Sequence, residues 1–207
     1  MTGERSIAFD FTLSERVLTR RITTINMSSY YDLNSILTDS QKVPCTFELA
    51  VPGLGYLSGN PGTSITQNTK VELPLWLGEM LAVNRLSNSA DTLITMDMPA
   101  ALNKRVMNAL KADAKSVDLR AQAMHFYGLG ARMLELFEDE EVVVEILMET
   151  FKKRSQEVAD KASGSRNLAG EGGEFVRGLE EQERALFRAA HDGQANVRKW
   201  FESAGRD

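Results

Sequence analysis

The chain has 207 residues, of which 43% are hydrophobic, enough for one or two small domains with a buried core. Its formal charge of −5 gives no overall attraction to nucleic acid, so a DNA contact would need a local basic patch. The apolar runs all fall short of the roughly 18 residues that a membrane span needs. A single cysteine, Cys45, excludes an internal disulfide. We therefore expect no membrane partner, and a reducing compartment.

Residues 1–27 are predicted to be a disordered N-terminal extension, as is common for chain termini. Arginines lie among the apolar side chains of this segment, but Glu4, Asp10 and Glu15 argue against a mitochondrial presequence. Met27 would also serve as a start, which would make the first 26 residues a gene-model extension.

Residues 28–73 are expected to form a small β-rich module. Within it, residues 31–37 suggest one helical turn with three apolar side chains facing inward. These side chains are Leu33, Ile36 and Leu37. Such a small module buries little apolar surface alone, so we expect it to need the helices that follow.

Residues 43–49 alternate between apolar and polar side chains, which predicts a strand with one buried face. Pro44 cannot donate to a neighbouring strand, so this strand should lie at a sheet edge or have Pro44 near its start. The glycine-rich run 52–59 lacks the Gly-Lys-Ser/Thr of a phosphate loop and predicts turns instead. Residues 70–73 are predicted to form the last strand.

The chain changes character between residues 71 and 81. Pro74 has a backbone angle that suits the first helical turn, and apolar side chains follow it at helical spacing. We therefore expect residues 74–207 to form a helical assembly module. Five helices are predicted, at residues 74–84, from Pro99 to Leu110, from a Ser116 cap to Phe137, from an Asp139 cap to Val158, and from Phe175 to Phe201. A flexible loop is expected at residues 163–173. The predicted fold class is α+β, predominantly α.

The candidates for catalysis or metal binding are sparse. His125 and His191 lie far apart in sequence and have no ligand spacing to Cys45, so we predict no metal, no cofactor and no enzymatic activity. His125 is interpreted as a packed core or interface residue, with a hydrolase site near it as a remote alternative. Gly128 and Gly130 indicate either a helix break or the close approach of another group.

Lys152, Lys153 and Arg154 form the one compact basic cluster of the sequence. Near the C-terminal half of a helix they can complement the helix dipole. They also give the alternative function, a DNA-binding protein that uses a local basic patch, although three charges in an acidic chain make a weak footprint.

Several segments in order resemble one known family. They are SYYDLNSIL at residues 29–37, VPGLG at 51–55, VELPLWL at 71–77, HFYGLG at 125–130 and the late segment at 179–187. Together they resemble the Psf-three type of subunit of the eukaryotic GINS complex, over about residues 28–203. Residues 1–26 and the loop at 163–173 lie outside the likeness.

The resemblance implies a non-catalytic structural subunit of a tetramer that acts in DNA replication in the nucleus. It implies the other three GINS subunits as partners, and beyond them the Mcm ring and its RecJ-related partner, with DNA contacted at most indirectly. We expect interface burial through a few apolar and aromatic residues. The candidates for folding and assembly are Leu75, Trp76, Met80, His125, Phe126, Tyr127, Gly128, Gly130, Leu186, Phe187 and Trp200.

Overall fold

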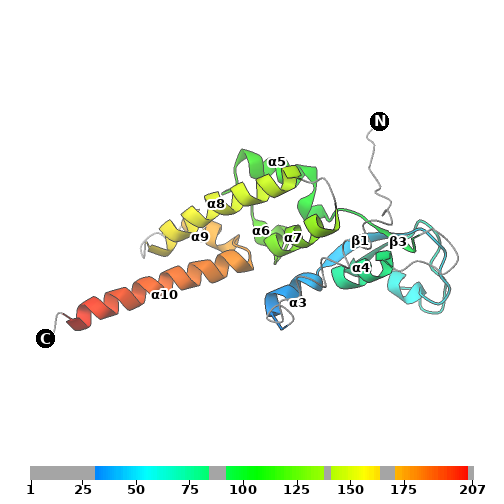
Figure 1. Ribbon diagram of the computed structural model, residues 1–207, viewed down its shortest axis with the longest axis horizontal. Coiled ribbons are helices and arrows are strands. Elements are labelled where there is room, and N and C mark those ends of the chain that lie inside the picture. Colours follow the sequence, from blue (N-terminus) through cyan, green and yellow to red (C-terminus); the bar gives the residue numbers. More distant parts are fainter. Residues whose placement is uncertain (1–30, 84–91, 138–140, 164–170, 205–207) are drawn as a thin grey trace. The chain divides into compact units, whose positions relative to one another are not determined.

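The computed structural model describes residues 31–83, 92–137, 141–163 and 171–204. The chain divides into two compact units, residues 1–99 and 100–207, and each is described here by itself (Figure 1). Three sequence-based expectations lie outside the described residues. They are the extension at 1–27, the Asp139 cap and most of the predicted flexible loop, residues 164–170.

The first unit is built on a three-stranded antiparallel sheet in the order β2-β1-β3. Its strands are β1 (Lys42–Phe47), β2 (Lys70–Pro74) and β3 (Ile94–Met96). The predicted alternation is confirmed in β1, where Val43, Cys45 and Phe47 are fully buried. These side chains form the core of the unit together with those of the helix that lies against the sheet.

β1 is the central strand, so the expectation of an edge position was wrong and the alternative, Pro44 near the strand start, was right. Its two neighbours explain how a proline is accommodated there. The carbonyl of Pro44 accepts from the N–H of Asp97 at 2.9 Å, just past the end of β3 at Met96. The N–H that proline lacks would therefore pair beyond the β1–β3 ladder, where its absence costs little.

Helix α4 (Leu75–Val83) packs on all three strands of the sheet. Leu75 is fully buried, and its N–H donates to the carbonyl of Gln41 at 2.9 Å. At Gly78 a Cβ would lie only 3.2 Å from Cys45 Sγ, which shows how closely this helix approaches β1. The division expected between residues 73 and 74 thus differs from the structure, because α4 completes the core of the β unit and the units separate after Pro99.

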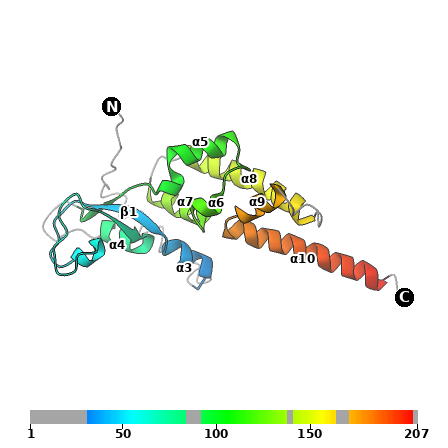
Figure 2. The same ribbon diagram turned by 180° about the vertical axis from the view of Figure 1, so that it is seen from behind.

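Helix α3 (Leu33–Asp39) replaces the predicted single turn and begins where Asp32 accepts from the N–H of Ser35 at 2.9 Å. The prediction that its apolar side chains face inward was wrong. Leu33, Ile36 and Leu37 are all exposed, and only Thr38 of this helix is buried. The reason is position, because α3 lies beyond one end of α4 rather than over the sheet (Figures 1 and 2).

The glycine-rich segment forms turns, as predicted, around the short 3-10 helix η1 (Gly55–Ser58). Gly53 and Gly59 have φ angles of 81° and 84°, a region that side chains with a Cβ rarely adopt. A single bridge between Val51 and Ile65 closes the segment. It presents no helix N-terminus of the kind that holds phosphate.

The second unit is entirely helical in its described part. Its elements are η2 (Ala100–Leu102), α5 (Lys104–Ala112), α6 (Leu119–Gln122), α7 (Phe126–Leu136), α8 (Glu141–Ser163), α9 (Glu171–Arg177) and α10 (Glu181–Ala204). Helix α8 is central, with α5, α7 and α10 packed around it. The predicted α+β class, mostly helical with a small sheet, is confirmed. The helices of the described ranges include none with both the length and the apolar character to cross a membrane.

Three of the five predicted helices are each divided in the structure. The second becomes η2 and α5, and Asn103 caps α5 by accepting from the N–H of Val106 at 2.9 Å. The third becomes α6 and α7, and Asp118 rather than Ser116 caps its start by accepting from the N–H of Ala121 at 2.9 Å. The fifth becomes α9 and α10, separated at Gly178. We call residues 178–180 the elbow, because the helical chain breaks there and restarts.

The surroundings of Gly130 decide between a helix break and a close approach, the two interpretations of Gly128 and Gly130. Helix α7 runs without a break through Gly128 and Gly130. A Cβ at Gly130 would lie 2.7 Å from Cδ1 of Leu147 on α8. The close-approach interpretation therefore holds at Gly130, and the helix break occurs earlier, before Phe126.

Candidate assembly surface on helix α10

Helices α8 and α10 pack together over part of their lengths (Figure 1). A hydrogen bond at the end of α8 joins Gln194 of α10 to Ser163, where Nε2 donates to Oγ at 3.1 Å. Helix α8 ends at Ser163, whereas α10 continues to Ala204. Within the second unit, the final turns of α10 therefore extend past the helix that covers its earlier turns (Figure 2).

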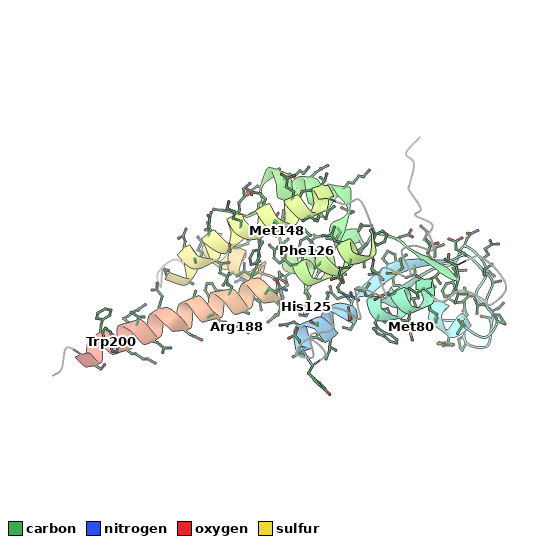
Figure 3. The ribbon with its side chains drawn as sticks, in the orientation of Figure 1. Met80, His125, Phe126, Met148, Arg188 and Trp200 are labelled. Atoms are coloured by element: carbon green, nitrogen blue, oxygen red, sulfur yellow. The ribbon has the colours of Figure 1, made fainter. Side chains whose placement is uncertain are left out.

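These final turns carry large apolar side chains that remain exposed. Val197 is 55% exposed, Trp200 63% and Phe201 64%, and Trp200 lies near the free end of the helix (Figure 3). The rings of Trp200 and Phe201 meet edge to face, with centroids 4.9 Å apart. We call Val197, Trp200 and Phe201 the α10 end patch. Its aromatic content is typical of a protein contact rather than of a solvated helix face.

The base of α10 is fixed by a buried ion pair with α8. The guanidinium of Arg154 donates from Nε to Glu183 Oε1 at 2.7 Å and from Nη2 to Oε2 at 2.9 Å. Its other bonds go to backbone carbonyls, from Nη1 to Ala114 and Val117 and from Nη2 to Gly178. The five N–H donors of Arg154 thus have five acceptors, which is the full capacity of a guanidinium.

Glu183 is satisfied as completely as its partner. Besides Arg154, its carboxylate accepts from the hydroxyl of Tyr127 at 2.9 Å and from the N–H of Glu180 at 3.3 Å. The ring of Phe175 lies 5.0 Å from the guanidinium carbon of Arg154. Burial, with the Glu183 charge as the next cause, raises the pKa of the Tyr127 hydroxyl well above its usual range. The network ties α7, α9 and α10 to α8 and so fixes where α10 starts.

Helix α10 is capped reciprocally at the elbow. Glu180 Oε1 accepts from the N–H of Glu183 at 3.0 Å, while the N–H of Glu180 donates back to Glu183. This is the pattern of a capping box, with glutamate in the place usually taken by serine or threonine.

The predicted segment at residues 125–130 belongs to the core more than to a surface. His125 and Phe126 are buried, and Tyr127 enters the Glu183 network. Helix α10 contributes the other predicted candidates of this unit. Leu186 is exposed, and Phe187 is partly buried with its ring stacked on that of His191 at 6.3 Å.

The predicted candidates of the first unit divide between core and surface. Leu75 is fully buried and holds α4 on the sheet. Trp76 and Met80, four residues apart on α4, are 50% and 56% exposed. Trp76 and Met80 therefore offer an apolar surface on α4.

The three residues of the basic cluster do not form one exposed surface. Arg154 is completely buried and saturated, so its candidacy as a DNA contact was wrong, because a phosphate cannot reach its donors. Lys152 and Lys153 are exposed, and Lys153 pairs with Glu149 at 3.3 Å. The described ranges contain no cluster of three His, Cys, Asp or Glu side chains arranged to hold a metal ion.

Sequence reasoning missed the partnership of Arg154 with Glu183. A signal existed, because Arg154 follows Val143, Leu147 and Thr150 at helical spacing on the buried side of α8. Glu180 has a weaker signal, since it comes three residues before another glutamate, the spacing of a capping box.

Comparison with known families assigns each unit. Residues 31–83 match the family described as PSF3 N-terminal domain. Residues 101–202 match the family described as GINS complex protein helical bundle domain. The second match covers α5 to α9 and most of α10, including the Arg154 network and the α10 end patch.

Named relatives align over most of the chain. A Phaeosphaeria nodorum protein named DNA replication complex GINS protein PSF3 is 58% identical over 180 residues, which are 87% of this chain and 99% of that protein. An Aspergillus fumigatus protein of the same name is 58% identical, over 85% of this chain and 98% of its own length. The Schizosaccharomyces pombe protein of that name is 34% identical over 84% of this chain and 98% of its length. The chain belongs to the PSF3 family of GINS proteins.

Proposed function

We propose that this chain is a non-catalytic structural subunit of the GINS tetramer, and that the α10 end patch contacts a sister subunit. The relatives' shared name, DNA replication complex GINS protein, supports the membership. The observation that carries the structural role is the projection of Val197, Trp200 and Phe201 beyond the end of α8. Aromatic side chains held on a rigid helix lose little entropy on binding, which makes them effective anchors.

The Arg154 network gives this surface its rigidity. A helix that projects from its unit can present a fixed surface only if its base is held. Four groups hold the base of α10: Arg154, Glu183, Tyr127 and the capping box at Glu180. Such preorganisation lowers the entropic cost of association. On the first unit, Trp76 and Met80 are a second candidate contact.

The other three GINS subunits are the proposed partners. Through them the chain supports assembly and activity of the Mcm-containing replicative helicase and its RecJ-related partner, in both initiation and elongation. This role is nuclear, requires no cofactor and places DNA at most in indirect contact. The burial of Arg154 weighs against the alternative of DNA binding through the basic cluster.

Co-expression with the three sister subunits, followed by native mass measurement, tests this proposal. The expected result is one complex that contains one copy of each subunit. A chain that purifies alone as a stable monomer and leaves its sister subunits behind would contradict the proposal. Expression of the chain by itself is the matched control.

A further inference from the structure

The elbow between α9 and α10 buries two carboxylates beside one cation. Glu180, Glu183 and Arg154 are each completely buried. All five donors of Arg154 are taken, two of them by Glu183 and the rest by backbone carbonyls. No guanidinium donor remains for Glu180. If both carboxylates were ionised, the cluster would carry one uncompensated negative charge.

The hydrogen bonds of Glu180 fit a neutral carboxyl. Its Oε1 accepts from the N–H of Glu183. Its Oε2 is buried and has no hydrogen-bond partner among the residues that the structure describes. An ionised carboxylate normally needs several donors or a paired cation when water is excluded. A protonated carboxyl needs far less, because its charge is gone.

The other titratable groups around the elbow do not supply the missing charge. Arg120 Nη1 lies 3.5 Å from Glu181 Oε2, and Arg184 Nε donates to the carbonyl of Leu179. Asp118, beside Gly178, is a further acid, while Tyr127 already donates to Glu183. His125 is buried one residue after Met124, whose carbonyl accepts from the N–H of Glu181.

The electrostatics of Glu180 agree with its geometry. Burial is the largest cause that raises its pKa, and the neighbouring Glu183 charge raises it further. Hydrogen bonds from the backbone N–H groups of residues 181–183 lower it. The net effect raises the pKa of Glu180 from 4.5 to about 7.

We propose that Glu180 is protonated in the folded chain on the acidic side of neutrality, and that its ionisation loosens the elbow that sets the direction of α10. The proton on Glu180 lies in the core of the second unit, so its presence does not depend on which partner α10 contacts. Between pH 4.5 and about 7 the folded chain keeps a proton that the open chain loses. The stabilisation is therefore complete below the lower value and is lost as pH rises through the upper one.

Hydrogen exchange of the amides of the elbow and of the first turns of α10, residues 178–188, tests this in the full chain co-expressed with its sister subunits. Exchange is measured from about pH 5 to about pH 8 and corrected for the intrinsic rate, so that it reports the opening equilibrium. The wild-type opening constant should rise by roughly tenfold per pH unit up to about 7 and then level off, as expected for one proton. Glu180→Gln, which cannot ionise, should remove that rise.

Two further variants complete the design. Glu145→Gln changes an exposed glutamate of α8 and should keep the wild-type pH dependence. Glu180→Ser removes the carboxyl but creates a serine capping box with Glu183, so it tests the proposal even if the glutamine variant does not fold. Loss of the rise in either Glu180 variant, with the Glu145 control unchanged, supports the proposal. A wild type without the rise, or the same rise in wild type and in every folded Glu180 variant, would overturn it.

Discussion

Arg154 and Glu183 form a two-pronged ion pair in the core of the second unit, with Nε–Oε1 at 2.7 Å and Nη2–Oε2 at 2.9 Å. The two residues lie on α8 and α10, helices that must be held together for the end of α10 to point in one direction. A buried pair is not necessarily better than an apolar contact, but losing one partner leaves the other charge unpaired. The fold of this unit therefore requires both Arg154 and Glu183.

Arg154→Met should destabilise the full chain by about 3–5 kcal/mol, because it leaves the Glu183 carboxylate buried without a cation. Urea denaturation followed by circular dichroism measures the change. Lys152→Met, an exposed neighbour on the same helix, should change stability by no more than about 0.5 kcal/mol.

The double variant Arg154→Met/Glu183→Gln separates charge from packing. It should recover part of the stability lost in Arg154→Met, since no buried charge is left unpaired. A double variant as unstable as the sum of its two single variants would mean that the pair contributes no coupling.

Two helix glycines give a matched pair with opposite expected effects. Gly193 on α10 has open space where a Cβ would lie, so Gly193→Ala should stabilise the chain by about 0.5–1 kcal/mol through helix propensity. Gly130→Ala gains the same propensity but drives a Cβ to 2.7 Å from Leu147 Cδ1. Overpacking of about 1–3 kcal/mol exceeds that gain, so the net effect should be a loss. A higher denaturation midpoint for Gly130→Ala than for Gly193→Ala would contradict the packing of α7 on α8.

Cys45 reports on the opening of the sheet. It is fully buried, and burial, with the Asp97 charge as a lesser cause, raises the pKa of its thiol to about 12. A thiol reagent at mildly alkaline pH should label it at least about a hundredfold more slowly than in urea-unfolded chain, because reaction requires local opening. The unfolded thiol ionises near 9, so stability should fall as pH rises from there towards 12. Equal labelling rates in native and unfolded chain would place Cys45 at the surface.

The sequence predicted the elements whose signals are local. The alternation at Val43, Cys45 and Phe47 predicted β1, and Pro74 predicted the start of α4 to within one residue. The breaks at Ala123 and Gly178 were missed, because apolar spacing continues across each of them. The outward-facing Leu33, Ile36 and Leu37 could not be predicted, since helical spacing defines a face but not what covers it.

The sequence predicted the candidate site only in part as well. Aromatic residues near the chain end predicted an interface, and the structure added that α10 continues past the end of α8. The basic cluster misled because three adjacent charges suggest one exposed surface. On a helix, successive residues point in directions about 100° apart, so Arg154 lies inside while Lys152 and Lys153 lie outside.

The most direct test of the assembly role is the incorporation of a Trp200→Ala/Phe201→Ala double variant into the complex. Both side chains are exposed, so their truncation should change the stability of the free chain by no more than about 0.5 kcal/mol each. Lys199→Ala, an exposed neighbour on the same turn, is the matched control. Each chain is co-expressed with tagged sister subunits, and the share recovered with them is measured by native mass. We predict at least about a tenfold loss for the double variant and none for the control, as for interface anchors. Full incorporation of the double variant would contradict the proposed role of the α10 end patch.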